Sequence, residues 1–117
     1  MNKIYFLSSC DTCRRIISEL NLKEKNLVFQ DIKTEKITLP QLKELKKLSG
    51  SYEALFNKKA RKYKNLKINE KNLNEDDLEK CILNEYTFLK RPVIVYNNQL
   101  FIGNSKKTIN EAKKLIF

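Results

Sequence analysis

The chain has 117 residues, a length that suits one domain able to fold without a metal or disulfide staple. Its 41% hydrophobic and 32% charged residues, with two glycines and two prolines, exclude a disordered chain. The net charge of +10 favours anionic partners, but we interpret it as a solvated basic surface and predict no direct contact with nucleic acid.

The sequence predicts a cytoplasmic protein without a membrane anchor. No segment approaches the roughly 20 apolar residues that a membrane span needs, and the four-residue run that starts at Ile4 is too short for a signal peptide. Three cysteines without framework spacing argue against a secreted scaffold built on disulfides. A reducing cytoplasm fits this cysteine content best.

The first third of the chain predicts a β-α-β unit. Residues 3–7 form an apolar run typical of a buried strand, and residues 27–32 are expected to form a second strand. Between them, residues 11–22 carry one apolar helical stripe, made of Cys13, Ile16, Ile17 and Leu20. The length of this crossover favours parallel pairing of the two strands.

A helical insertion is expected at roughly 38–88. Thr38 is suited to cap its first helix, Pro40 to lie in the first turn, and Gly50 to end it. Asn74 is suited to cap a later helix. The predicted apolar face of the first helix consists of Leu39, Leu42, Leu45 and Leu48. A basic run (Lys58, Lys59, Arg61, Lys62 and Lys64) either contacts an anionic partner or forms a solvated helix face.

The last third predicts a β-hairpin and a final helix. Residues 92–96 and 99–102 are apolar runs joined by Asn97-Asn98, a pair that tolerates the left-handed backbone of a two-residue turn. The final helix follows Gly103. This order of elements predicts an α/β, thioredoxin-like single domain over 1–117, made of β-α-β plus β-β-α around the insertion.

Cys10 and Cys13 form a C-x-x-C motif between the first predicted strand and the first helix. Unpaired backbone N–H groups and the helix dipole favour an anion at such a position, and a thiolate is an anion. In such motifs the pKa of a thiol falls to about 3.5–7.5, against about 8.5 for a free cysteine. The motif therefore predicts a reactive thiol.

Two other interpretations of these cysteines are weaker. A structural zinc site needs four ligands, and the chain has no histidine and one further cysteine, Cys81. An inert core thiol fits Cys81, which we expect to be buried, and partly fits Cys13, which shares the apolar stripe of its helix. Cys10 precedes that helix. We therefore expect Cys10 to be a nucleophile and Cys13 to resolve the species formed on it.

Basic residues and a proline complete the candidate site. Arg14 and Arg15 follow the motif and either stabilise the thiolate or lie on a solvated surface. Pro92 opens a predicted core strand, where it removes a backbone donor. A trans proline at a strand entrance is one explanation, but the neighbouring C-x-x-C motif favours a cis bond after Arg91 that presents a backbone edge to substrate.

Three segments together resemble the arsenate reductase (ArsC)/Spx family: Cys10-x-x-Cys13-Arg14, Ser49-Gly50-Ser51, and the stretch 89–95 with Arg91-Pro92. The resemblance covers essentially the whole chain. It implies a thioredoxin-like fold with a helical insertion, a nucleophilic Cys10, an anion-binding Arg14, and Arg91 beside a cis-proline.

The resemblance also bears on activity. It adds Thr12, Arg15 and Pro92 as substrate-binding candidates, and it implies glutathione or a glutaredoxin-like protein as external thiol donor, with no bound cofactor. Family arsenate reductases use further arginines, which would fall near Asn57 and Gly103 here, so true arsenate reduction is less expected. The sequence therefore predicts a thiol-dependent reductase.

Two alternatives remain open. The chain is similar to Spx-type regulators, which carry a Cys-x-x-Cys redox switch and bind the RNA polymerase α subunit. Under that interpretation, oxidation of Cys10 and Cys13 changes affinity for a protein partner without turnover. A further alternative is a family member that binds a partner regardless of its redox state.

Overall fold

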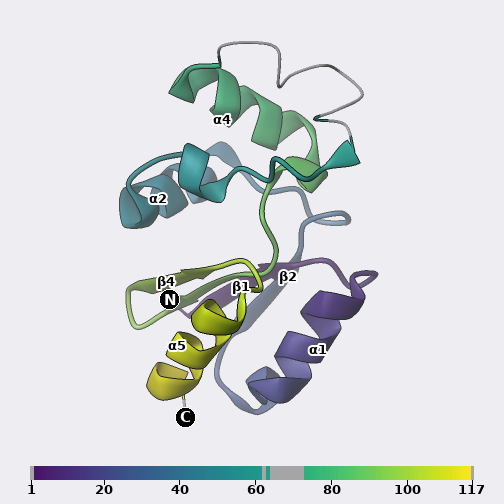
Figure 1. The fold of residues 1–117 in the computed structure, drawn as a ribbon, viewed down its shortest axis with the longest axis vertical. Coiled ribbons are helices and arrows are strands. Elements are labelled where there is room, and N and C mark those ends of the chain that lie inside the picture. The colour runs from purple at the N-terminus through teal and green to yellow at the C-terminus, as the bar shows by residue number, and fades with distance from the viewer. Residues whose placement is uncertain (1, 62, 64–72, 117) are drawn as a thin grey trace. The chain divides into compact units, whose positions relative to one another are not determined.

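The computed structural model describes residues 2–61, 63 and 73–116 (Figure 1). It divides into two compact units, one formed by 1–35 with 91–117 and the other by 36–90. The assignment of 1–117 to one domain with an insertion at roughly 38–88 stays a prediction. Each unit is described by itself below.

The first unit contains a four-stranded sheet in the order β2-β1-β3-β4. Its central strand β1 (Lys3–Phe6) pairs in parallel with β2 (Val28–Asp31) and antiparallel with β3 (Val93–Tyr96). β3 continues through a two-residue turn into β4 (Gln99–Ile102). Asn97 and Asn98 hold φ values of +51° and +63° in this turn, as the sequence predicts.

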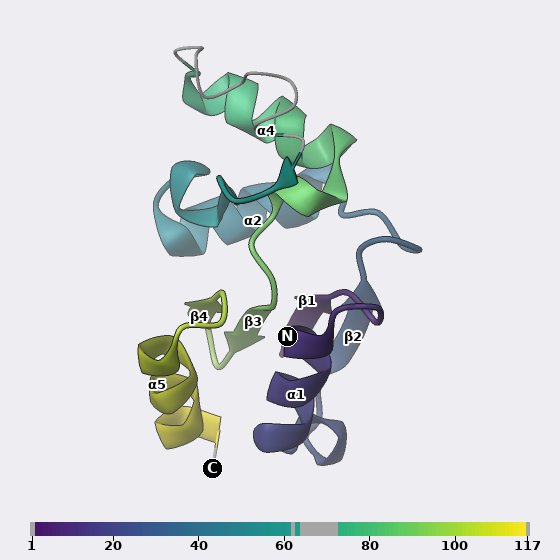
Figure 2. The same cartoon turned by 45° about the vertical axis from the view of Figure 1, so that its right-hand side comes forward.

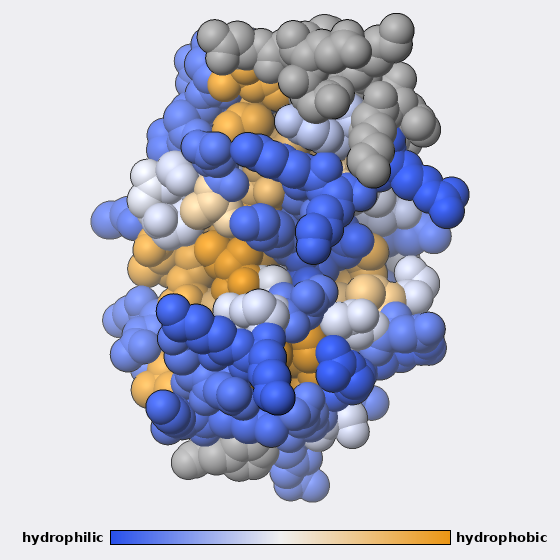
Figure 3. Space-filling view, viewed as in Figure 1, coloured by the Kyte–Doolittle hydropathy of each residue, from blue (hydrophilic) through white to orange (hydrophobic). Residues whose placement is uncertain are grey.

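Helices α1 (Asp11–Glu19) and α5 (Lys106–Ile116) cover one face of this sheet (Figure 2). Their apolar stripes meet the strands in one core, and the outer surface of this layer in Figure 3 is mainly hydrophilic. Lys113 of α5 and Glu19 of α1 form an ion pair at 2.8 Å across the layer. The core consists of Ile4, Ile16, Ile17, Leu20, Leu22, Ile94, Phe101, Ile109, Ala112 and Ile116.

Helix α1 is shorter than the predicted helix over 11–22. It ends at Glu19, and Asn21 adopts a left-handed backbone with φ +54°. The chain then forms the single turn η1 (Leu22–Glu24), whose Leu22 side chain returns to the core. The apolar spacing that predicts a continuous helix is thus produced by a helix and a separate turn.

The second unit contains α2 (Leu39–Ser49), η2 (Glu53–Leu55), α4 (Glu75–Asn84) and η4 (Tyr86–Phe88). Thr38 caps α2 through a capping box with Gln41, and Asn74 caps α4 in the same way. Gly50 ends α2 with φ +91°. These three termini lie where the sequence predicts them.

Two leucines of α2 depart from the predicted apolar face. Leu42 and Leu45 are buried, but Leu39 and Leu48 are 38% and 37% exposed. Each three-residue step turns back by about 60° around a helix of 3.6 residues per turn, so four leucines spaced by three cannot share one face. The two central leucines reach the core and the two outer ones rotate away from it.

Polar contacts join η2 to α4 within the second unit. The Glu75 carboxylate accepts hydrogen bonds from the backbone N–H groups of Tyr52 at 2.7 Å and Glu53 at 3.2 Å. The Tyr52 hydroxyl donates to Glu79 at 2.6 Å. Cys81, expected to be buried on α4, is half-buried.

The structure describes only part of the basic run. Lys62 and Lys64 lie outside the described residues, so the predicted helix face is described only at its other positions. No helix within the described part of the chain is long and apolar enough to cross a membrane.

Packing of α1 on the sheet is expected to dominate the stability of the first unit. Ile16 is fully buried, so Ile16→Ala is expected to lower the free energy of unfolding by about 2–5 kcal/mol. Ile16→Val, which keeps most of the side chain, is expected to cost about 0.5–1.5 kcal/mol. Urea denaturation measures both, and equal effects of the two variants would contradict this packing.

Candidate active site

Cys10 occupies the N-cap position of α1, directly after β1 and its short loop. Its backbone is extended, with φ −92° and ψ 114°. Its N–H donates to the Leu7 carbonyl at 3.1 Å, and its carbonyl accepts from the Arg14 N–H at 3.1 Å. The Cys10 side chain is half-buried, whereas Cys13, one turn further along, is fully buried. Both are thiols in this structure.

The pKa of the Cys10 thiol is lowered from its ordinary value. Burial of the sulfur raises this pKa, but the other contributions outweigh burial. The backbone N–H and the thiol of Cys13, together with the backbone N–H of Thr12, donate hydrogen bonds to the sulfur. The positive charge of Arg91 acts in the same direction. The start of α1 therefore stabilises a thiolate at Cys10.

The pKa of the Cys13 thiol moves the opposite way, to about 11. Burial is the main cause, and the hydrogen bond and negative charge shared with Cys10 add to it. A backbone hydrogen bond at Leu7 and the charge of Arg91 oppose this rise without cancelling it. The pair therefore loses its first proton from Cys10, and Cys13 keeps its proton to a higher pH.

Arg91 and Pro92 lie in the same unit as the two thiols, immediately before β3. The peptide bond between them is cis, Pro92 is buried, and Arg91 is half-buried. Arg91 is the arginine whose charge lowers the pKa of both thiols. The structure thus brings Cys10, Cys13, Thr12 and Arg91 together.

The other two arginines of the candidate site, Arg14 and Arg15, are exposed residues of α1. Arg14 forms an ion pair with Asp11 on the same turn, and its side chain is 61% exposed. Arg15 is also exposed, and its charge contributes to the lowered pKa of Glu19. Arg14 and Arg15 are therefore available to a ligand at the surface of α1, whereas Arg91 acts on the sulfurs themselves.

A contact that the sequence analysis did not select holds the loop before Cys10. The Ser8 hydroxyl donates to the Asp31 carboxylate at 2.6 Å, and the Ser8 N–H donates to the same oxygen at 3.4 Å. The Lys33 N–H donates to the other oxygen at 3.1 Å. These bonds fix the β1–α1 loop to the end of β2. Asp31 is the last residue of β2, which the sequence predicts to pair in parallel with the first strand. Parallel pairing brings the ends of the two strands together, and this could have indicated a contact between Asp31 and the loop before Cys10.

No metal centre accompanies these groups. Within the described ranges, His, Cys, Asp and Glu side chains do not gather in threes around a point that could hold a metal ion.

The site and the sheet together define a thioredoxin-like protein with a dithiol at the start of its first helix. The sequence model of the ArsC family matches residues 5–112, so the chain belongs to the ArsC family. The family assignment made from the sequence is confirmed.

Curated relatives with similar sequences are transcriptional regulators. The chain is 24% identical over 112 residues to the global transcriptional regulator Spx 1 of Bacillus cereus, covering 93% of this chain and 84% of the relative. It is 24% identical over 110 residues to the global transcriptional regulator Spx 2 of Bacillus anthracis, covering 92% and 83%.

Solved structures confirm the α/β, thioredoxin-like fold. Arsenate reductase from Vibrio cholerae superposes with a TM-score of 0.78 at 19% identity, covering 97% of this chain and 96% of that one. An arsenate reductase related protein from Brucella melitensis superposes with a TM-score of 0.72 at 22% identity, covering 97% and 95%. At these identities the likeness concerns the fold alone.

Alkylation should separate the two thiols of the motif. The Cys10 pKa is lowered and the Cys13 pKa is raised to about 11, so Cys10 has the larger thiolate fraction at pH 7. Lower intrinsic nucleophilicity of the more acidic thiol offsets part of this advantage, and burial of Cys13 adds to it, so we expect Cys10 to react about tenfold faster. Iodoacetamide labelling followed by mass spectrometry measures the two initial rates.

Arginine variants provide the matched control for this labelling. Arg91→Gln is expected to move the midpoint of the Cys10 rate profile to higher pH, because the charge that favours the thiolate is lost. Arg14→Gln, which removes a charge paired with Asp11, is expected to move it less. Equal rates for Cys10 and Cys13, or a larger shift in Arg14→Gln, would contradict the assignment.

The Ser8–Asp31 contact should depend on pH. The pKa of Asp31 is lowered mainly by the Ser8 hydrogen bond, so its stabilisation is present above the ordinary value of 3.8 and is lost as pH falls below it. A double-mutant cycle with Ser8→Ala and Asp31→Asn should give a coupling of about 0.5 kcal/mol at pH 7, because the pair is exposed. Coupling that persists undiminished at pH 2.5 would exclude the charged carboxylate as its source.

Proposed function

We propose that this chain is a thiol-dependent reductase in which Cys10 is the nucleophile and Cys13 the resolving thiol. The observation that carries the proposal is the opposite displacement of two pKa values within one helical turn, lowered at Cys10 and raised to about 11 at Cys13. An enzyme that exchanges disulfides needs one thiolate ready to attack and a second thiol held back until a mixed disulfide exists.

The proposed cycle begins with a disulfide substrate. The Cys10 thiolate attacks one sulfur, the S–S bond of the substrate breaks, and the departing sulfur leaves as a thiolate that takes a proton from solvent. Cys10 is then uncharged, which removes the negative charge that raises the Cys13 pKa. Cys13 loses its proton, attacks the Cys10 sulfur and releases the second substrate thiolate. A Cys10–Cys13 disulfide remains, and the substrate has gained two electrons.

External thiols complete the proposed cycle. Two glutathione molecules, or one glutaredoxin-like dithiol, transfer two electrons to the Cys10–Cys13 disulfide and become a disulfide themselves. A cytoplasmic location would supply these reductants. Arg91 would stabilise the Cys10 thiolate at the start and end of each turnover, and the cis Arg91–Pro92 segment and Thr12 would contact the substrate beside it.

Arg14 and Arg15 would attract an anionic group of the substrate or reductant at the surface of α1. Arsenate fits this site less well than a disulfide does. Family arsenate reductases use further arginines, and the resemblance puts these near Asn57 and Gly103 here. An oxyanion would therefore lack two charged contacts worth about 1.5–3 kcal/mol each.

A second candidate function is redox sensing without turnover. It is favoured by the curated relatives, which are named as Spx regulators. In this alternative the Cys10–Cys13 disulfide forms under oxidation and changes affinity for the RNA polymerase α subunit. Both candidate functions use the same two thiols. They differ in whether the thiols reduce a substrate repeatedly or are oxidised once as a signal.

Steady-state reduction of a small disulfide distinguishes the two candidates. With glutathione, glutathione reductase and hydroxyethyl disulfide, the wild-type chain should oxidise NADPH above the uncatalysed rate. Cys10→Ser should reduce this rate at least about 100-fold, because the nucleophile is lost. Cys13→Ser should accumulate a mixed disulfide on Cys10 that mass spectrometry detects, and Cys81→Ser is the matched control that should leave the rate unchanged.

The outcomes assign the function. Catalysis lost in Cys10→Ser supports the reductase. Absence of turnover, together with capture of the RNA polymerase α subunit that differs between oxidised and reduced protein, favours the sensor. Turnover and capture that are both indifferent to Cys10→Ser would reject both redox proposals.

A further inference from the structure

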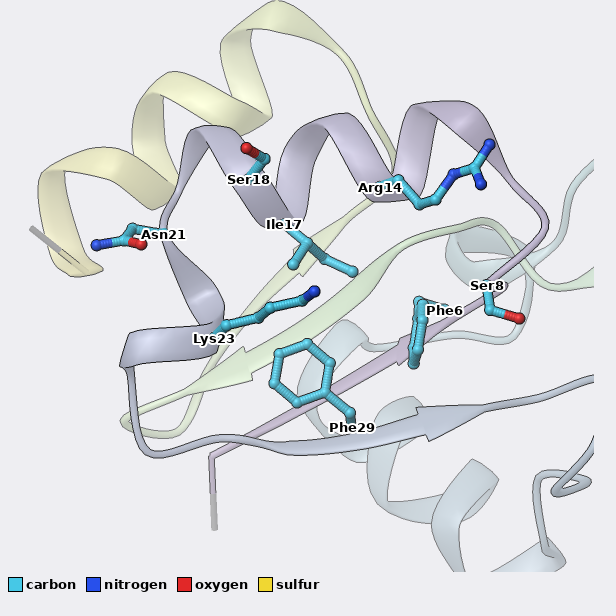
Figure 4. A pocket seen from close by; sticks show the side chains of 8 residues that line it. All are labelled: Phe6, Ser8, Arg14, Ile17, Ser18, Asn21, Lys23 and Phe29. Atoms are coloured by element: carbon cyan, nitrogen blue, oxygen red, sulfur yellow. The ribbon is translucent and has the colours of Figure 1, made fainter.

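A cavity of about 470 Å³ lies within the first unit, between α1, η1 and the edge of the sheet formed by β1 and β2 (Figure 4). Its volume falls in the range of pockets that hold small organic molecules. Cys10 and Cys13 are not among its lining residues, although two residues close to Cys10 in the sequence, Ser8 and Arg14, are. The lining consists of Phe6, Ser8, Arg14, Ile17, Ser18, Asn21, Lys23 and Phe29.

The floor of the cavity is aromatic. Phe6 of β1 and Phe29 of β2 meet edge to face, with ring centroids 5.8 Å apart and planes at 88°. Both rings are only half-buried, although Ile17 of α1 beside them is 95% buried. Aromatic surface left open inside a cavity offers contact area to an apolar group, and its burial would be favourable.

Lys23 gives the cavity its positive charge. Figure 4 shows the side chain of this exposed residue running back along the cavity toward Ile17. The Arg14 guanidinium instead points toward the start of α1, where it pairs with Asp11.

Among the described residues, the lining of the cavity contains no carboxylate that could pair with the Lys23 ammonium group. Three carboxylates accept hydrogen bonds from lining residues: Asp11 from the Arg14 guanidinium, Asp31 from the Ser8 hydroxyl at 2.6 Å, and Glu24 from the Asn21 amide at 2.7 Å. The Ser18 hydroxyl lies on the exposed side of α1. An anion beside Lys23 would thus meet one ammonium group and an aromatic floor.

We propose that this cavity binds a small organic monoanion, with an apolar body of one or two rings or a short alkyl chain and a single carboxylate or sulfonate. The apolar body would lie on Phe6, Phe29 and Ile17, and the anionic group would pair with Lys23. This proposal goes beyond the reductase function, because it needs neither thiol of the C-x-x-C motif.

Fluorescence titration with 8-anilinonaphthalene-1-sulfonate tests the proposal, because this probe combines aromatic rings with one sulfonate. The folded wild-type chain should show saturable binding. Lys23→Gln should weaken binding about fivefold through loss of the ion pair, and Lys23→Arg should restore it. Ser18→Phe, which adds a ring at an exposed position of the wall, should weaken binding about tenfold or more by filling the cavity.

Lys107→Gln is the matched control, since it removes the same charge from an exposed position on α5 in the same unit. It should leave probe affinity unchanged. Octanoate should displace the probe at lower concentration than 1-octanol, which has the same chain length and no charge. Thermal unfolding of each variant shows whether it is folded at the temperature of the titration.

The result that overturns the proposal is equally specific. Probe affinity that is the same in Lys23→Gln, Ser18→Phe and wild type would show that the dye binds elsewhere. Non-saturating binding, or equal displacement by octanoate and octanol, would reject an anion site. If Ser18→Phe fails to fold, the comparison of Lys23→Gln, Lys23→Arg and Lys107→Gln decides alone.

Discussion

The structure depends above all on backbone N–H groups at the start of α1 that point toward the Cys10 sulfur. Together with the Cys13 thiol and the charge of Arg91 they outweigh burial of the sulfur, and they exist because the chain turns from β1 directly into a helix. The same turn carries Cys13 into the core, where burial has the reverse effect. One geometric event, a strand followed at once by a helix, therefore makes two chemically identical residues unequal.

Most of the architecture could be predicted from the sequence, because short-range rules determine it. Thr38, Gly50 and Asn74 are residues whose side chains or backbone freedom suit helix ends, and Asn97-Asn98 suits a tight turn. The prediction was wrong where one residue pattern is compatible with two backbone structures. The apolar spacing beyond Glu19 fits either a longer helix or a turn, and tertiary packing of Leu22 decided for the turn.

The candidate site was predictable in its sulfur chemistry and less so in its charges. A C-x-x-C motif after a strand indicates which thiol is activated, but the sequence could not rank the two arginines expected to stabilise its thiolate, Arg14 and Arg91. In the structure Arg14 pairs with Asp11, and Arg91, far along the chain, acts on the sulfurs through pairing of β3 with β1. The Ser8–Asp31 contact likewise depends on pairing across strands.

Complete burial of Cys13 has a consequence for how the two thiols would respond to oxidation. A peroxide arriving from solvent would meet Cys10 first, since its sulfur is the more accessible one and its thiol has the lowered pKa. The resulting sulfenic acid has a thiol one helical turn away, and condensation of the two expels water and forms a disulfide that cellular thiols can reverse. Under the proposed thiol chemistry, the buried thiol would therefore protect Cys10 from oxidation to the irreversible sulfinic state.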